Sequence, residues 1–288
     1  MRTVEGWMKK ENGKLEQEEK KKDYIELQAD ELLVGGAVLI TIGTIITALS
    51  ISRVFITRSP QGAEGLVIGN GIESVGNVFQ VLGKEKLYSI EPIEPRKTGV
   101  LGSWLQAIGN AGNAVAVQEG INLYRFTFTD EGSRNATNQE GGGNGTNSRQ
   151  AELANEANTA QGVQRTAEQE GVEEALKRSI GFDAISSGIQ GVGAYLEGSS
   201  TARLPAFPTQ SIEVTGDFLT TIGAFLEASG AVLAIQDQEL KGVLLQLIGS
   251  WVQVGGSSLG LYALTTERAL HQQEFEEKYR YSYRRFTT

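Results

Sequence analysis

The chain has 288 residues, with 36 Gly, 5 Pro, one His, no Cys and a net charge of −9. The absence of Cys excludes disulfides, thiolate metal sites and thiol catalysis, and a single His leaves little material for a zinc site or a His-based acid–base pair. The excess of acidic residues argues against general nucleic-acid binding. Abundant Gly with scarce Pro is typical of neither a loop-rich nor a disordered chain, so the glycine needs another explanation.

Residues 1–31 are dominated by charged side chains of both signs. They contain no apolar stretch after a short basic start, so no classical secretory signal is expected. The pattern predicts a solvated, charged helix, and the alternative is an electrostatic docking arm.

Residues 32–52 are uncharged and apolar throughout. About 20 such residues suffice to cross the hydrocarbon core of a bilayer. A buried helix of a soluble bundle is also apolar on all sides, so both interpretations remain open. Residues 242–264 and 100–118 are weaker candidates, because Gln and Asn interrupt them. Two further helical segments are poor candidates for a membrane span, because one contains Asp183 and the other contains Asp217 and Glu227.

Many glycines recur every seven residues. The series are Gly36 and Gly43; Gly62, Gly69 and Gly76; Gly102 and Gly109; Gly181 and Gly188; Gly216, Gly223 and Gly230; and Gly242, Gly249 and Gly256. The neighbours match as well, since Gly-Ser-Trp-Leu-Gln at 102–106 parallels Gly-Ser-Trp-Val-Gln at 249–253. Gly83 continues one series, but Gly83 and Gly198 precede polar turns and are interpreted as helix C-caps.

A repeat of seven residues indicates helices rather than strands. At about 100° per residue, the apolar positions fall at about 200–300° from the glycine and the polar ones at about 40–140°. Glycine inside a helix costs about 1 kcal/mol relative to Ala, so this many glycines indicate a gain from close contact between helix backbones. We therefore interpret the glycines as a packing seam beside an apolar stripe.

The expected fold is all-α, with two repeated three-helix units of antiparallel helices. The predicted regions are a charged helix (1–31), a first unit (32–128), a Gly/Asn/Ser-rich flexible linker followed by a polar helix (129–171), a second unit (172–270) and a Tyr/Arg-rich tail (271–288). The expected helices are 32–53, 61–84 and 98–120 in the first unit, and 172–198, 210–236 and 238–269 in the second. Proline-containing turns separate several of them.

Aromatic and Arg side chains are typical interface anchors, and they also suit the interfacial belt of a membrane protein. The candidates are Trp104, Trp251, Tyr279, Tyr281, Tyr283 and Arg284. For the tail, the alternative is a terminal helix or strand that packs on its own domain.

No catalytic constellation emerges. The Gly-Ser-Ser-Leu-Gly stretch at 256–260 matches a nucleophile elbow, but it lies inside a predicted helix instead of between a strand and a helix. His271 is interpreted as a solvated surface residue. Glu73, Asp183, Asp217 and Glu227 could meet as a metal site in a bundle, but no helix supplies the accompanying His. We expect no enzyme activity, no cofactor and no bound metal.

The Gly-Ser-Trp-Leu/Val-Gln frame resembles a group of uncharacterised repeat proteins of spore-forming bacilli, a domain of unknown function. The resemblance covers most of both helical groups and implies a bacterial helical-repeat protein with no catalytic residues to transfer.

The leading functional hypothesis is a non-catalytic, self-associating structural or scaffolding protein that packs through its glycine seams. The alternative is a membrane-embedded or membrane-remodelling protein, including a pore-forming one. The expected partners are further copies of the chain or a lipid bilayer, but not nucleic acid. The expected location is the bacterial cytoplasm or inner membrane.

Overall fold

The computed structural model describes residues 4–59, 62–138 and 148–285, with side chains described for 14–59, 62–125 and 170–279. This part of the chain forms long helices and no strand. They are α1 (Val4–Thr57), α2 (Ala63–Ile90), α3 (Glu94–Asn138), α4 (Ser148–Thr201), α5 (Gln210–Ile235) and α6 (Glu239–Arg285).

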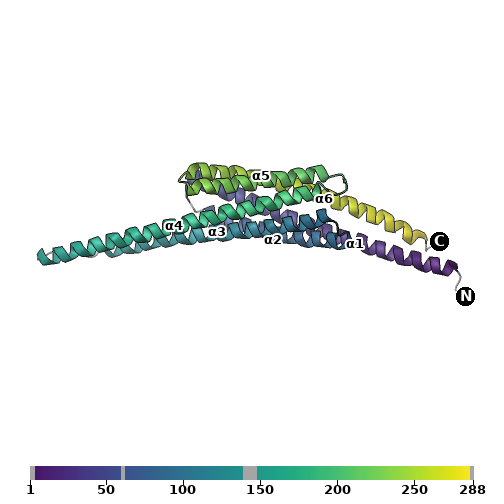
Figure 1. Ribbon diagram of the computed structural model, residues 1–288, viewed down its shortest axis with the longest axis horizontal. Helices are drawn as coiled ribbons and strands as arrows, with labels where there is room; N and C mark the ends of the chain where they lie inside the picture. Colours follow the sequence, from purple (N-terminus) through teal and green to yellow (C-terminus); the bar gives the residue numbers. More distant parts are fainter. Residues whose placement is uncertain (1–3, 60–61, 139–147, 286–288) are drawn as a thin grey trace.

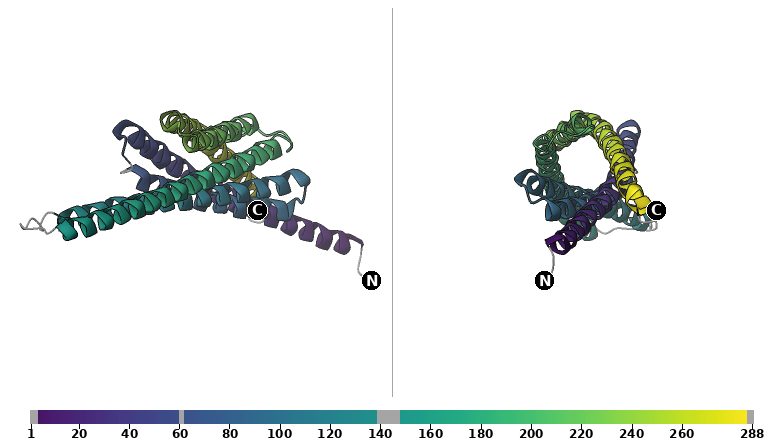
Figure 2. Two further views of the ribbon diagram at one scale, coloured as in Figure 1. Left: turned by 60° about the vertical axis from the view of Figure 1, so that its left-hand side comes forward. Right: turned by 90° about the vertical axis from the view of Figure 1, so that its right-hand side faces the viewer.

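The six helices form a closed ring. Each packs against the helices that precede and follow it in the chain, and α6 returns to pack against α1. Figure 2 shows this ring end-on, with the helices arranged around a common centre. The expected all-α fold of antiparallel helices is therefore confirmed, and its architecture is a six-helix barrel.

Two pairs of helices continue beyond the ring in opposite directions. The first part of α1 and the last part of α6 extend from one end, where both chain termini lie (Figure 1). The α3–α4 pair extends from the other end. We call these the terminal end and the hairpin end. No proline interrupts α1 or α6, so the segments expected as a separate N-terminal helix and a C-terminal tail are continuous with the barrel helices.

The predicted linker is shorter than expected. α3 continues through Asn138 and α4 begins at Ser148, so helix occupies much of the segment assigned to the linker. The Gly-rich residues 139–147 lie outside the described residues. The polar helix expected after the linker is the first part of α4.

Sharp turns connect the helices at the hairpin end. Asp237 has a φ of 60°, and the backbone N–H of Gln238 donates to the carbonyl of Leu233 over 3.0 Å, which ends α5 with a Schellman-type cap. Arg58, with a φ of 54°, ends α1 in a similar left-handed conformation. These short connections keep successive helices antiparallel.

Backbones of three helix pairs come into close contact through small residues. A Cβ added to Gly36 of α1 would lie 2.6 Å from the carbonyl oxygen of Gly76 in α2. In α3, a Cβ on Gly102 would lie 2.7 Å from the carbonyl oxygen of Gly193 in α4. These distances leave no room for a side chain, so the backbones are in van der Waals contact.

The third pair, α5 and α6, has the longest series of such contacts. A Cβ on Gly223 would lie 2.6 Å from the carbonyl oxygen of Gly249, and one on Gly230 would lie 2.5 Å from that of Gly242. Gly216 and Gly256 face each other in the same way at 2.7 Å and 2.6 Å. The close contacts thus join consecutive helices into three hairpins within one chain.

The remaining glycines of the predicted seams divide into two groups. Gly43, Gly62, Gly69 and Gly109 also lie against a neighbouring backbone, whereas Gly181 has only a side-chain methyl at 3.8 Å and Gly188 has nothing within 4 Å. In α4 the contact positions are Ser186 and Gly193 instead. Gly83 and Gly198 lie inside α2 and α4, so neither is a helix C-cap.

Candidate functional site: a polar lumen with an acidic vestibule

The inner side of the barrel is polar. The buried side chains of the barrel helices include many amides, hydroxyls and carboxylates, among them Thr44, Glu73, Asn77, Asn110, Asn113, Ser187, Gln190, Glu197, Ser250 and Gln253. The fully buried apolar residues are mostly Ala. We call this inner side of the barrel, where the polar groups pack, the lumen.

The outer side of the barrel is apolar. Each helix exposes at least four large apolar side chains, and four from the barrel part of each helix form what we call the outer stripe. Its members are Val38, Ile42, Ile45 and Leu49; Ile68, Val75, Phe79 and Leu82; Leu101, Trp104, Ile108 and Val115; Phe182, Ile185, Val192 and Tyr195; Phe218, Ile222, Phe225 and Val232; and Leu244, Ile248, Trp251 and Tyr262. This distribution is the reverse of that in a water-soluble bundle, where the polar side faces out.

Amide side chains bridge helices inside the lumen. Gln190 of α4 donates from Nε2 to Oε1 of Gln253 in α6 over 2.7 Å, and Asn113 of α3 donates to Gln190 over 3.3 Å. These residues come from three helices that are not all neighbours in the ring, so the bonds run through the interior.

The carboxylates expected within the helices all lie on the inner side, but they do not meet. Glu73 accepts a hydrogen bond from Thr47 at 3.0 Å, Glu227 accepts one from Ser250 at 2.6 Å, and Asp183 accepts one from Gln246 at 3.4 Å. Asp217 lines a cavity nearer the terminal end. Within the described residues, no three acidic or His side chains come close enough to hold a metal ion together.

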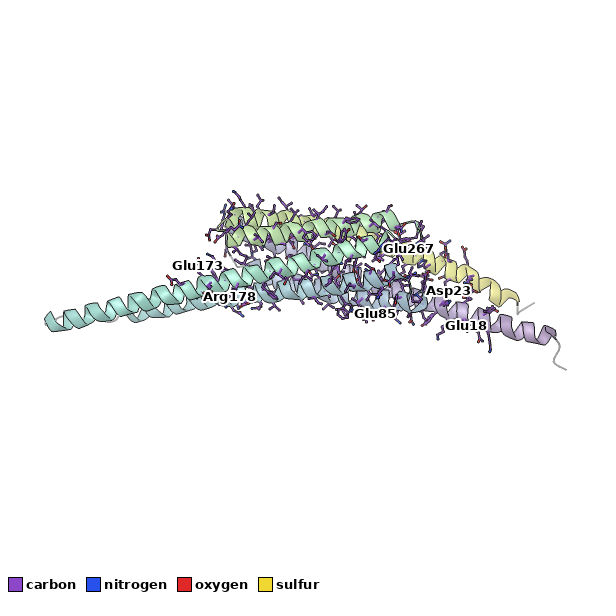
Figure 3. All side chains as sticks on the ribbon, viewed as in Figure 1. Glu18, Asp23, Glu85, Glu173, Arg178 and Glu267 are labelled. Atoms are coloured by element: carbon purple, nitrogen blue, oxygen red, sulfur yellow. The ribbon has the colours of Figure 1, made fainter. Side chains whose placement is uncertain are left out.

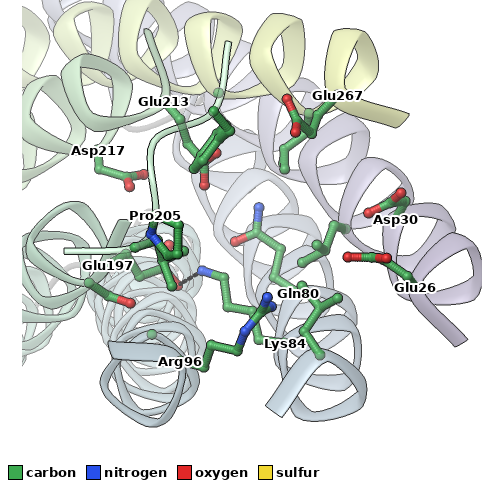
Figure 4. A pocket seen from close by; sticks show the side chains of 18 of the residues that line it. Glu26, Asp30, Gln80, Lys84, Arg96, Glu197, Pro205, Glu213, Asp217 and Glu267 are labelled. Carbon is green, nitrogen blue, oxygen red and sulfur yellow. Dashed lines mark ion pairs between the residues drawn. The ribbon is translucent and has the colours of Figure 1, made fainter. Parts of the chain in front are cut away.

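At the terminal end, a cavity of 310 Å³ lies between the helices, and we call it the vestibule. Its charged lining includes seven carboxylates, Glu26, Asp30, Glu91, Glu197, Glu213, Asp217 and Glu267, against Lys84, Arg96 and His271. The connection between α4 and α5, residues 202–209, contributes Leu204, Pro205, Ala206 and Phe207 to the wall. Figure 4 shows the labelled charged side chains directed into this space from the surrounding helices.

Each cationic side chain of the vestibule has an acidic partner. Lys84 of α2 lies 2.9 Å from Glu197 of α4, and Ser103 of α3 donates a hydrogen bond to the same carboxylate. Arg96 lies 2.7 Å from Glu91. The Lys84–Glu197 ion pair connects α2 to α4, the helices on either side of α3, and both side chains are mostly buried.

His271 is paired, rather than solvated as expected. Its Nδ1 lies 2.8 Å from Oδ2 of Asp30 in α1, and its Nε2 lies 3.3 Å from Glu267. The hydrogen bond to Asp30 raises the pKa of His271 to about 9, against the opposing effect of partial burial. The imidazole is therefore charged at neutral pH and joins α1 to α6 at the rim of the vestibule.

Farther out, the paired parts of α1 and α6 are held by ion pairs. Lys278 lies 2.7 Å from Asp23 and 2.9 Å from Glu19, and the Tyr279 hydroxyl donates to Asp23 over 3.0 Å. Tyr279 thus packs on its own chain, which was the alternative expected for the tail. The side chains of Tyr281, Tyr283 and Arg284 lie outside the described residues.

The two tryptophan candidates lie in the outer stripe. Trp104 is 43% exposed and Trp251 is 46% exposed. Trp251 donates from Nε1 to the Ser52 hydroxyl over 3.2 Å, so it contacts α1 while just under half of its surface is exposed. Both residues are available to a surrounding medium or partner.

A comparison with protein families shows which family the chain belongs to. A family model of unknown function, DUF6944, matches residues 31–131 and again residues 136–261. The chain belongs to this family. The two matches confirm the repeated organisation expected from the sequence, with α1–α3 and α4–α6 as the repeated segments. No curated protein and no solved structure gave a significant match.

Proposed function

We propose that this DUF6944 protein is a membrane-embedded helical barrel with a polar, acid-lined lumen that offers a path for small hydrophilic solutes. The observation that carries the proposal is the outer stripe, which places large apolar side chains on the outside of all six helices around a polar interior. In water such a surface far exceeds the few hundred Å² of apolar patch usual on a monomer. In a bilayer it is the expected surface.

The lengths of the helices agree with this proposal. Segments 32–52, 65–83, 98–118, 179–202, 214–235 and 242–266 lie side by side in the barrel, contain no Lys or Arg, and span 19 to 25 residues each. About 20 residues cross the hydrocarbon core. The charged residues labelled in Figure 3 lie outside these segments, toward the two ends of the barrel.

The acidic residues inside the six segments are compatible with a bilayer because of their orientation. They are Glu73, Asp183, Glu197, Asp217 and Glu227, and none is exposed on the outer side. Ionisable groups in membrane helices usually face the bundle interior or a water-filled cavity. Length and composition alone single out only α1 and α5 as possible spans among the described residues, because the inward-facing amides and carboxylates make the other helices less apolar.

Self-association through glycine seams receives less support. All the seam glycines except Gly181 and Gly188 lie against a neighbouring helix backbone of the same chain, so they are not available to a second copy. A second copy could cover part of the outer stripe, but the stripe runs around the barrel and one two-fold interface covers only one side of it. The bilayer accounts for the whole surface.

We further infer that the heptad glycines are a repeated feature of the family and that the protein resides in the inner membrane of a spore-forming bacterium. The first inference is supported by the matching frames at 102–106 and 249–253, which fall in different matched segments. The second rests on the resemblance described above together with the outer stripe.

Extraction of membranes from expressing cells tests the proposal. The protein should remain in the pellet after alkaline carbonate and be released by mild detergent, as integral proteins are. A matched variant with Ile108→Glu, Ile185→Glu and Ile222→Glu in the outer stripe should lose membrane retention, because a carboxylate facing lipid costs about 2.5–3.5 kcal/mol at the centre of a helix. Release of the unaltered protein by carbonate alone would contradict the proposal.

A further inference from the structure

The vestibule contains carboxylates on opposite walls that form no ion pair within the described residues. Glu213 and Asp217 of α5 lie on one side and Glu26 of α1 on the other (Figure 4). None of these three forms an ion pair within the described part of the chain, whereas the nearby Glu197, Glu91 and Asp30 do. Glu213 accepts only a 3.3 Å hydrogen bond from Thr201. The vestibule therefore has carboxylates at two opposite positions, which we call the acidic poles, and each has room in its interactions for a cation.

A buried amide points into the space between the poles. Gln80 is 9% exposed, and Figure 4 shows its amide directed to the middle of the cavity. No hydrogen bond of this side chain occurs among the described residues, although buried amides are normally paired. An unpaired buried amide at the centre of a cavity is the arrangement expected where a polar ligand group completes the hydrogen bonding.

The wall between the poles is apolar. Leu33, Leu87, Leu204, Phe207 and Leu264 line the same cavity. Ligand sites in proteins commonly combine an apolar lining with a few convergent polar groups. Small inorganic cations would gain nothing from such a wall, and no three acidic side chains of the described part converge on one metal position.

We propose that the vestibule binds an aliphatic diamine, with its two ammonium groups at the two acidic poles and its methylene chain along the apolar wall. One ammonium group lies with Glu213 and Asp217, and the other lies with Glu26. Gln80 accepts a hydrogen bond from an ammonium N–H through its amide oxygen. This site goes beyond membrane embedding and does not depend on it, since the vestibule is formed by the chain alone.

Isothermal titration calorimetry of the full-length protein in detergent micelles tests the site, with 1,5-diaminopentane as the probe. We expect saturable binding of one molecule per chain, and at least about tenfold weaker binding of pentylamine, which has one charge, since each lost charge pair reduces affinity by about that factor. Absence of diamine binding to the folded protein would overturn the proposal, as would equal affinity for pentylamine. Binding of calcium at the same site with higher affinity than the diamine would overturn it as well.

Isosteric variants locate the binding. Asp217→Asn and Glu26→Gln remove one charge from opposite poles, and each should weaken diamine binding about tenfold, whereas Glu239→Gln at the exposed start of α6 should leave it unchanged. If one pole variant does not fold, the variant of the other pole gives the same readout. An equal loss in Glu239→Gln would contradict the assigned site. The measurement needs no bilayer, so it is independent of the carbonate experiment.

Discussion

Gly249 and Gly255 lie on the same helix but have different surroundings. A Cβ at Gly249 would lie 2.6 Å from the carbonyl oxygen of Gly223, while one at Gly255 would have nothing within 4 Å. Substitution of Gly249 by Ala should therefore force α5 and α6 apart and destabilise the protein by about 2 kcal/mol, the usual cost of overpacking. Thermal unfolding of the detergent-solubilised protein measures the effect.

Gly255→Ala is the matched control on α6. This variant should be as stable as the parent or gain up to about 1 kcal/mol, because Ala favours the helix and meets no neighbour. If the two variants lower the melting temperature equally, the glycine contacts do not determine how closely the helices pack.

We expect the contact between α1 and α6 to depend on pH, because His271 forms an ion pair across it. Its pKa is raised from 6.5 to about 9 by Asp30, so the charged pair stabilises the folded state fully below about pH 6.5 and loses this contribution as the pH rises through about 9. The segment around residue 271 should exchange its amide hydrogens faster at pH 9.5 than at pH 6, after correction for intrinsic rates. The loss should be about 1–2 kcal/mol, as for other charge-assisted hydrogen bonds.

His271→Gln provides the comparison for this pH effect. It retains a hydrogen-bonding side chain but does not titrate, so corrected exchange in this variant should be the same at both pH values. A parent protein whose corrected exchange is equally insensitive to pH would show that the His271–Asp30 pair does not hold the helices together.

At the scale of the elements, the hydrogen bond between Gln190 of α4 and Gln253 of α6 crosses the inner side of the barrel. Replacement of both residues by Ala removes the bridge and two bulky side chains from the inner side, without touching the outer stripe. We expect liposomes containing this double variant to release a small trapped cation faster than liposomes with the parent protein. A double variant that permeates no faster than the parent would show that these amides do not restrict the path.

Sequence patterns predict the helices, but they do not predict which side of each helix faces the outside of the barrel. The heptad separates Trp104 from Gln106 on the helix surface, and both residues lie in α3 as expected. The same periodicity suits a bundle in water and an inverted bundle in lipid. It therefore does not predict whether the polar or the apolar side of each helix faces outward. The structure buries Gln106 at 5% exposure and leaves Trp104 at 43%.

The vestibule could not be predicted from local patterns. Lys84 and Glu197 belong to different repeated segments and come together because α3 packs against both α2 and α4. In the same way, the His271–Asp30 pair requires α6 to close on α1. Closure of a ring depends on the summed angles between helices, which no single helix sequence encodes. The contact positions in α4 also differ from the heptad pattern, because Ser186 lies against Gly109 whereas Gly188 contacts nothing.

At the scale of the whole molecule, the barrel combines a polar interior with an apolar exterior along six helices of membrane-spanning length. The glycine contacts hold three hairpins together, and the pairing of α1 with α6 closes the ring. Helix association through small residues does not require water to drive it, which is the condition inside a bilayer. The architecture, the outer stripe and the inward carboxylates all agree with the proposed membrane-embedded barrel.

The chain has no Cys, so single spin labels can be introduced without background. Labels at Ile108 and Ile222, which are 56% and 52% exposed in the outer stripe, report the medium around the barrel in reconstituted liposomes. The account predicts that oxygen relaxes both labels strongly and a water-soluble nickel chelate relaxes them weakly, while a label at Glu173 near the hairpin end shows the opposite. Strong relaxation by the nickel chelate at Ile108 and Ile222 would show that the outer stripe faces water, and would contradict the membrane-embedded barrel.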